Sequence, residues 1–172
     1  MRLLVLSDIH GQEAVLHQIL RCETASPQKI DLVVFLGDGL REFDSLSYRG
    51  EFALLPMLSV RGNCDLFGSE GVPELRKLSF CGHRILMTHG HRFDVKSGLS
   101  RATAFAASKE IDLLLFGHTH VPKEIRLEKG DFFEGAPVSR PLILFNPGAV
   151  RSGCYGLVTL SEDKIVCEHR QK

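Results

Sequence analysis

The chain has 172 residues and carries 21 Lys plus Arg against 21 Asp plus Glu, so its formal net charge is zero. With 44% hydrophobic and 24% charged residues it has the composition of a folded globular protein, which excludes wholesale disorder, a collagen-like repeat and a strongly basic nucleic-acid coat. The neutral total leaves an anionic substrate open, because a binding site has its own local charge. The length suits one domain, and we expect residues 1–172 to form a single one.

The first apolar segment and the cysteines bear on the cellular compartment. The run Leu3–Leu6 is too short for the core of a signal peptide or for a membrane span. The five cysteines are an odd number without a C-x-x-C pair, which argues against a disulfide framework and a structural zinc knuckle. We therefore expect a cytoplasmic protein without a membrane partner. The oligomeric state stays open, with a homo-oligomer as one possibility.

The first third of the chain alternates apolar runs with one clear amphipathic segment. Arg2–Ser7 and Asp31–Leu36 are apolar runs that predict buried strands. Between them, apolar residues recur at the helical period over Gln12–Cys22, which predicts a helix with one apolar face. We expect a helical turn or two over Glu42–Tyr48, and Leu54–Val60 leads into the end of a third strand.

The rest of the chain predicts a hairpin, one more helix and several strands. The hairpin arms are Glu74–Phe80 and Arg84–Thr88, joined by a turn at residues 81–83. An alanine-rich helix is expected over Leu99–Lys109, and residues 129–141 are expected to form a loop. Alternation of strands and helices, followed by a strand-rich end, favours an α/β (α+β) fold. The remaining predicted strands are Asp112–Phe116, Lys123–Glu128, Leu142–Phe145, Gly156–Leu160 and Lys164–His169.

Five of the predicted strands end in side chains that can bind a metal ion. In α/β domains ligands gather at the carboxyl ends of strands, so side chains far apart in sequence can converge there. A set of carboxylates, imidazoles and one amide, without an obvious thiolate, suits manganese, iron, nickel or zinc. The side chains at these five strand ends are Asp8, His10, Asp38, Asn63, His89, His91, His118 and His120.

Each of these motifs also has an ordinary structural reading when it is taken alone. Asp8 can cap the following helix, and the Gly-Asp and Gly-Asn pairs can be plain turns. The two His-x-His pairs are harder to explain on a neutral surface. The combination favours a metal site, because all five strand ends carry metal-binding groups while the rest of each strand is apolar.

In their order along the chain, the motifs resemble those of the calcineurin-like metallophosphoesterases. They are Asp-x-His at 8–10, Gly-Asp at 37–38, Gly-Asn-x-Asp at 62–65, His-Gly-His at 89–91 and Gly-His-Thr-His at 117–120. The short chain and the segment Asn146-Pro147-Gly148 are similar to the branch of small single-domain phosphodiesterases, to which the retromer subunit of the same fold is related. The resemblance implies a four-layer αββα sandwich in which two facing mixed β-sheets are flanked by helices.

The resemblance also implies a centre of two divalent ions, with Mn²⁺ favoured over Fe, Ni or Zn. Two such ions, roughly 3.5–4 Å apart, share a hydroxide that attacks the phosphorus of a phosphate ester. By this resemblance the first ion is held by Asp8, His10 and His120, the second by Asn63, His89 and His118, and both by the bridging carboxylate of Asp38.

Protonation of the leaving group is the step at which this chain departs from the wider family. Many members carry a histidine directly after the Gly-Asn motif, whereas this chain has Cys64 there. We expect Cys64 to pack near or contact the substrate, with a weak-acid role less favoured. His91 is the other candidate, either as a catalytic and substrate-binding group or as a support for the ligands. Asp38 and Asn63 complete the predicted catalytic set, and the other three histidines, His17, His83 and His169, are expected to be solvated.

The function implied by the resemblance is a metal-dependent phosphoesterase that acts on a small phosphate ester. The preference for diesters over monoesters rests on the branch that the chain resembles. The alternative is a non-catalytic protein-interaction scaffold of the same fold, which degenerate ligand positions would indicate, and none is found. A nuclease ranks lower, because the short chain has no obvious basic stripe, and this disfavours duplex nucleic acid as a partner.

Overall fold

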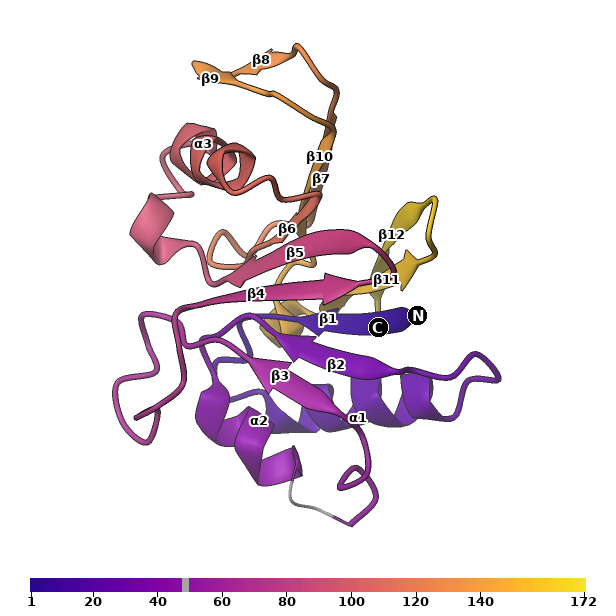
Figure 1. Cartoon of the computed structure of the whole chain (residues 1–172). Helices are drawn as coiled ribbons and strands as arrows, with labels where there is room; N and C mark the ends of the chain where they lie inside the picture. Colours follow the sequence, from indigo (N-terminus) through magenta and orange to yellow (C-terminus); the bar gives the residue numbers. More distant parts are fainter. Residues whose placement is uncertain (48–49) are drawn as a thin grey trace.

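The computed structural model describes residues 1–47 and 50–172, so the predicted helical position Tyr48 lies outside the described residues. Two five-stranded mixed sheets face each other, with helices on their outer sides (Figure 1). The first sheet has the order β12-β11-β1-β2-β3. Its strands are β1 (Arg2–Leu6), β2 (Leu32–Phe35), β3 (Met57–Ser59), β11 (Cys154–Leu160) and β12 (Ile165–Gln171).

The second sheet has the order β4-β5-β6-β10-β7. Strands β5, β6 and β10 run parallel, with Met87 opposite Leu115 and Leu115 opposite Phe145, and β4 and β7 pair antiparallel at the two edges. In the first sheet β1, β2 and β3 are parallel, and β11 and β12 continue the sheet beyond β1 with antiparallel pairings. The strands of the second sheet are β4 (Leu75–Phe80), β5 (His83–Thr88), β6 (Leu113–Leu115), β7 (Lys123–Leu127) and β10 (Leu142–Asn146).

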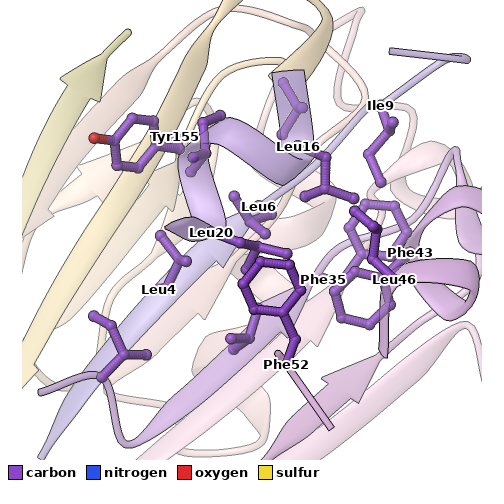
Figure 2. Packing of buried hydrophobic residues seen from close by; sticks show 14 of the residues in the cluster. Leu4, Leu6, Ile9, Leu16, Leu20, Phe35, Phe43, Leu46, Phe52 and Tyr155 are labelled. Carbon is purple, nitrogen blue, oxygen red and sulfur yellow. The ribbon is translucent and has the colours of Figure 1, made fainter. Parts of the chain in front are cut away.

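Three apolar layers hold the sandwich together. Helices α1 (Glu13–Thr24) and α2 (Leu40–Ser47) cover the first sheet through a buried cluster that includes stacked Phe35 and Phe43 (Figure 2). Helix α3 (Ser100–Ser108) covers the second sheet. Between the sheets, alternate strand residues such as Val34 and Met87 form the middle layer. Successive side chains of a strand point to opposite faces, so central strands with apolar layers on both faces, such as β2 and β6, are continuous apolar runs.

The predicted αββα sandwich of two mixed sheets is confirmed, with two local differences. The hairpin turn consists of Cys81 and Gly82 alone, both with positive φ, and His83 already belongs to β5. The predicted loop 129–141 contains a two-stranded ribbon of β8 (Phe132–Phe133) and β9 (Ala136–Pro137). Strands of two residues are too short to show a periodicity in the sequence.

His169, which was expected to be solvated, is exposed, and it also makes two contacts that the sequence did not predict. It lies in β12, where its Nε2 is 2.8 Å from the carbonyl oxygen of Asn146 and its ring stacks on Phe145 with the centroids 4.6 Å apart. The ring therefore supports the end of β10. None of the helices in residues 1–47 and 50–172 is long and apolar enough to cross a lipid bilayer.

Candidate metal centre

The parallel strands bring the predicted ligands to one edge of the sandwich. Asp8 follows β1, Asp38 follows β2, His89 follows β5, and His118 and His120 follow β6. Because the carboxyl ends of parallel strands lie at the same edge, each sheet contributes one group of side chains. The two groups meet across the interface between the sheets.

Two hydrogen bonds join the sheets at this edge. The His89 Nδ1 lies 2.8 Å from the carbonyl oxygen of Leu36, which makes Nδ1 the protonated nitrogen and leaves the Nε2 lone pair free. The backbone N–H of His118 donates to Oδ2 of Asp8 at 3.0 Å. Each bond therefore fixes the orientation of a predicted ligand from the opposite sheet.

Backbone strain is concentrated in the same place. Asp8, His10, Asp38, His118 and His120 all have φ between 45° and 69°, the left-handed region that side chains other than glycine rarely adopt. Each such residue costs about 1–3 kcal/mol, and it persists only where the surroundings over-determine the conformation. Strain of this kind gathers at functional sites, and here it turns five strand-end side chains toward one another.

The first group of possible ligands consists of Asp8, His10 and His120, whose ligand atoms all lie within 4.8 Å of one another. Oδ1 of Asp8 is 3.1 Å from Nε2 of His120 and 3.6 Å from Nε2 of His10. The two Nε2 atoms are 3.2 Å apart. Asp8 is completely buried, whereas both imidazoles remain partly accessible to solvent.

The second group consists of Asp38, His89 and His118. Nε2 of His89 is 3.3 Å from Oδ2 of Asp38 and 3.1 Å from Nδ1 of His118. The same Oδ2 is 3.8 Å from Nε2 of His10, which belongs to the first group. The Asp38 carboxylate thus faces ligands of both groups, which is the position that a bridging ligand needs.

One oxygen atom shows that a cation fits among these residues. Oδ2 of Asp8 accepts the hydroxyl of Ser7 at 2.6 Å, whereas Oδ1 is buried and has no hydrogen-bond donor among the described residues. A buried carboxylate oxygen without a partner is costly, and a cation satisfies it. Carboxylate oxygens and imidazole nitrogens in two groups of three are the donor chemistry of divalent transition metals.

The lowered pKa values of Asp38, His118 and His120 favour metal binding. Burial would raise the pKa of Asp38, but the hydrogen bond and charge of His89 and the N–H of Cys64 hold that pKa well below its ordinary value. Burial and then the charge of His89 lower the pKa of His118 to about 4. Burial is also the largest cause of the lowered pKa of His120. At neutral pH these imidazoles therefore keep their lone pairs free.

Asp65 anchors the loop that carries Asp38. Its Oδ2 accepts the backbone N–H groups of Asp38 and Gly62, each at 2.8 Å. Its Oδ1 accepts those of Gly39 and Leu40 at 2.8 and 2.9 Å, at the start of α2. The Gly-Asn-x-Asp motif included Asp65, but the sequence does not reveal that its partners lie on another strand end.

Asn146 anchors the loop that carries His118 and His120. This fully buried side chain donates from Nδ2 to the carbonyl oxygen of Gly117 at 2.9 Å, and its Nδ2 lies 3.0 Å from Oγ1 of Thr119. Gly117 has no room for a side chain, because a Cβ there would lie 1.9 Å from Oγ of Ser7. Asn146 and Gly117 thus fix the position of this loop against Asp8.

The other predicted site residues lie at the rim of this cluster. Asn63 is exposed in the loop after β3, and its Nδ2 donates to Sγ of Cys64 at 3.3 Å. The N–H of Cys64 donates to Oδ1 of Asp38 at 2.8 Å, and its Sγ lies within 4.8 Å of ligand atoms of His10 and Asp38. Burial and the neighbouring Asp38 raise the pKa of the Cys64 thiol to about 11, so it keeps its proton at neutral pH.

His91 begins the short 3₁₀ helix η1 (His91–Phe93), beside the second group. Its ring centroid is 5.5 Å from that of His89, and its Nδ1 is buried without a partner among the described residues. Nε2 is 3.8 Å from Oε1 of Glu74, a residue that the sequence did not single out. Glu74 also forms an ion pair with Arg61 at 3.2 Å, which holds this arginine beside the site.

The chain is similar to known metallophosphoesterases and phosphodiesterases. The model of the calcineurin-like phosphoesterase superfamily domain matches residues 1–163. A Bacillus subtilis protein named "Probable metallophosphoesterase YsnB" is 31% identical over 169 residues, which are 95% of this chain and 86% of that protein. Phosphodiesterase YfcE of Escherichia coli K12 is 26% identical over 167 residues, 87% of this chain and 79% of YfcE.

The fold is also similar to that of a protein whose name gives no enzymatic activity. The crystal structure of wild-type Vps29 from Entamoeba histolytica, complexed with Zn²⁺, superposes with a TM-score of 0.71 at 18% identity and covers 99% of both chains. At this identity the likeness concerns the fold alone. Taken with the sequence relatives and the two groups of ligand atoms, the match over residues 1–163 shows that the chain belongs to the calcineurin-like phosphoesterase superfamily.

Proposed function

We propose that the protein is a phosphodiesterase that works with two divalent ions, with Mn²⁺ as the favoured metal. The observation that carries this proposal is the position of the Asp38 carboxylate, whose Oδ2 lies 3.3 Å from His89 Nε2 and 3.8 Å from His10 Nε2. One carboxylate between two groups of ligand atoms is suited to hold two ions side by side. Bound there, the ions would supply a nucleophile from water and positive charge for the transition state.

The side chains of the site divide the remaining work among them. Asp8, His10 and His120 would hold one ion, and Asp38, His89 and His118 the other, with Asn63 as a further ligand from the loop after β3. The neutral imidazoles add ligands without adding negative charge, so Asp8 and Asp38 are the only anionic side chains among the proposed ligands.

Cys64 and His91 are placed to contact the substrate. The thiol of Cys64 keeps its proton at neutral pH and can donate an S–H hydrogen bond to a phosphate or leaving-group oxygen. Burial and then the charge of His89 lower the pKa of His91, so this imidazole is neutral at pH 7. A neutral imidazole positions a substrate better than it protonates a leaving group, and this favours substrates whose leaving group needs little help.

Hydrolysis of bis-p-nitrophenyl phosphate and p-nitrophenyl phosphate by protein loaded with Mn²⁺ tests the proposal. We expect turnover of the diester in preference to the monoester and about two bound ions per chain by elemental analysis. Asp38→Asn should lower kcat/KM at least about 100-fold while circular dichroism shows an intact fold. The exposed turn residue Asp163 provides the matched control, because Asp163→Asn should leave the rate unchanged.

The scaffold alternative makes the opposite prediction. Folded protein that hydrolyses no diester with Mn²⁺, Fe²⁺, Ni²⁺ or Zn²⁺ contradicts the enzymatic proposal. A protein partner recovered in stoichiometric amount, together with no metal by elemental analysis, would favour the scaffold. The groups of ligand atoms support the enzyme, because a scaffold has no need for five strained residues at three strand ends.

A further inference from the structure

Two cavities flank the candidate metal centre, one on each side of the loop after β3. The first has a volume of about 370 Å³, and Asp38 and Cys64 contribute to its lining. The second has a volume of about 340 Å³ and is lined in part by Asn63 and His91. Asp65 and Leu66 line both cavities. A phosphodiester has two arms on one phosphorus, and two cavities beside one centre can take one arm each.

The wall of the first cavity is apolar and unusually exposed. Leu66 is 73% exposed and Phe67 is 90% exposed, and neither belongs to the three buried clusters. Single exposed apolar side chains are common on protein surfaces, but these two are consecutive and line a cavity whose floor holds candidate ligands. They directly follow Asp65, whose four backbone hydrogen bonds hold the start of this wall against Asp38.

The rest of the same cavity is charged. Arg41 and Glu42, from the first turn of α2, line it together with Phe67. The cavity therefore places a guanidinium and a carboxylate beside an exposed aromatic ring, in addition to His10, Asp38, Cys64 and Asp65. A planar ring with a polar edge matches this combination, since its face can stack on Phe67 while its edge meets Arg41 and Glu42.

We propose that Phe67, with Leu66, forms a specificity wall that selects phosphodiesters in which one arm is a planar aromatic ring. This inference rests on the proposed phosphodiesterase function and adds the class of substrate to it. Phe67 acts on binding alone, because it does not belong to either group of metal-ligand atoms. Its loss therefore changes KM and leaves kcat in place.

Equilibrium binding of two small diesters to zinc-loaded protein tests the wall without requiring turnover. Diphenyl phosphate has aromatic arms and diethyl phosphate does not. We expect calorimetry to show that Phe67→Ala weakens the binding of diphenyl phosphate roughly 5- to 10-fold and leaves the binding of diethyl phosphate unchanged. Phe67→Tyr, which keeps the ring, should retain the binding. Leu54 lies outside the cavity and is 96% exposed, so Leu54→Ala is the matched control and should change neither affinity.

Kinetics separate this inference from the function on which it rests. With bis-p-nitrophenyl phosphate, Phe67→Ala should raise KM by a similar factor without lowering kcat. If Phe67→Ala turns over the diester with an unchanged KM, the specificity role of Phe67 is contradicted, whereas the phosphodiesterase proposal is supported. If Phe67→Ala binds diphenyl phosphate and diethyl phosphate more weakly by the same factor, the specificity wall is also overturned. The ring would then support the loop rather than bind an aromatic arm. Ring-dependent binding without any turnover supports the wall and contradicts the phosphodiesterase proposal.

Discussion

The carboxylate of Asp65 holds the backbone of Asp38 from another strand end, since the Asp38 N–H donates to Asp65 Oδ2 at 2.8 Å across 27 positions of the chain. Three further N–H groups, those of Gly39, Leu40 and Gly62, bind the same carboxylate. The strained φ of 62° at Asp38 is therefore fixed by a side chain that is not itself in either ligand group. The candidate bridge between the two groups thus depends on the loop after β3.

Asp65→Asn should both destabilise the protein and impair the site. An amide has only one acceptor oxygen, so at least two of the four backbone N–H groups lose their partner, at a cost of about 2–4 kcal/mol in the free energy of unfolding. Displacement of Asp38 should lower kcat/KM at least about tenfold. Urea denaturation and diester hydrolysis measure the two effects, with Asp163→Asn as the control. An unchanged rate in Asp65→Asn would contradict the positioning role.

Gly117→Ala should disrupt the contact between the two sheets. A Cβ at residue 117 would lie 1.9 Å from Oγ of Ser7, whose hydroxyl donates to Asp8. Relief of this overlap has to move Ser7 or the loop that carries His118, at a cost of about 1–3 kcal/mol in the free energy of unfolding. The affinity for added metal, measured by calorimetry, should fall as well.

Gly50 offers a matched control for this substitution, because a Cβ there would meet no atom within 4 Å. Gly50→Ala should leave the free energy of unfolding within about 0.5 kcal/mol of the wild type and should not change metal affinity. If Gly50→Ala and Gly117→Ala change the free energy of unfolding and the metal affinity equally, crowding at residue 117 does not cause these changes.

The sequence predicted the strand-end ligands because each of them follows an apolar run directly. Asp8, Asp38 and His89 are therefore recognisable from the chain alone, and parallel strands place them at one edge. The resemblance to a known family added the division into two groups of ligands. The structure brings together Asp8, His10 and His120, also Asp38, His89 and His118, and as a third set His10, Asp38 and Cys64.

The supporting residues could not be predicted, because their role depends on contacts between distant segments. Nothing local to Asn146 shows that it binds the carbonyl oxygen of Gly117, 29 positions away. His169 is exposed as expected, but its contact with the carbonyl oxygen of Asn146, which belongs to the other sheet, could not be predicted. The aromatic wall at Phe67 is likewise visible only once the loop is placed beside Asp38.

The thiol of Cys64 should react slowly with alkylating reagents in the metal-free protein. Burial and the charge of Asp38 raise its pKa from 9.0 to about 11, so the thiolate fraction at pH 8 falls about 100-fold relative to a thiol at the ordinary value. Peptide-resolved mass spectrometry after treatment with iodoacetamide measures the rate at this one cysteine. Asp38→Asn removes a negative charge next to the thiol and should accelerate the reaction. A fast reaction at Cys64 in the wild type would contradict this environment.

The stability of the metal-free protein should pass through a maximum near pH 6.5. The pKa of His118 is lowered from 6.5 to about 4, by burial first and then by the charge of His89, so between these values the unfolded chain binds more protons. The free energy of unfolding therefore rises with pH in this window, and His91 and His120, whose pKa values are also lowered, act in the same direction. One proton accounts for at most about 1.4 kcal/mol per pH unit, and solvent screening makes the slope smaller.

Above pH 6.5 the opposite slope is expected from His89. Burial would lower its pKa, but the hydrogen bond to Asp38 and the charges of Asp8 and Asp38 outweigh burial and raise it above 6.5. The folded protein then binds more protons than the unfolded chain, so stability is lost as the pH rises through the folded-state pKa. Urea denaturation in the presence of EDTA from pH 4.5 to 8.5 measures both limbs. His118→Asn should reduce the slope of stability below pH 6.5, and Asp38→Asn should reduce the slope above it. A stability that rises throughout the range from pH 4.5 to 8.5 would show that His89 does not gain a proton on folding.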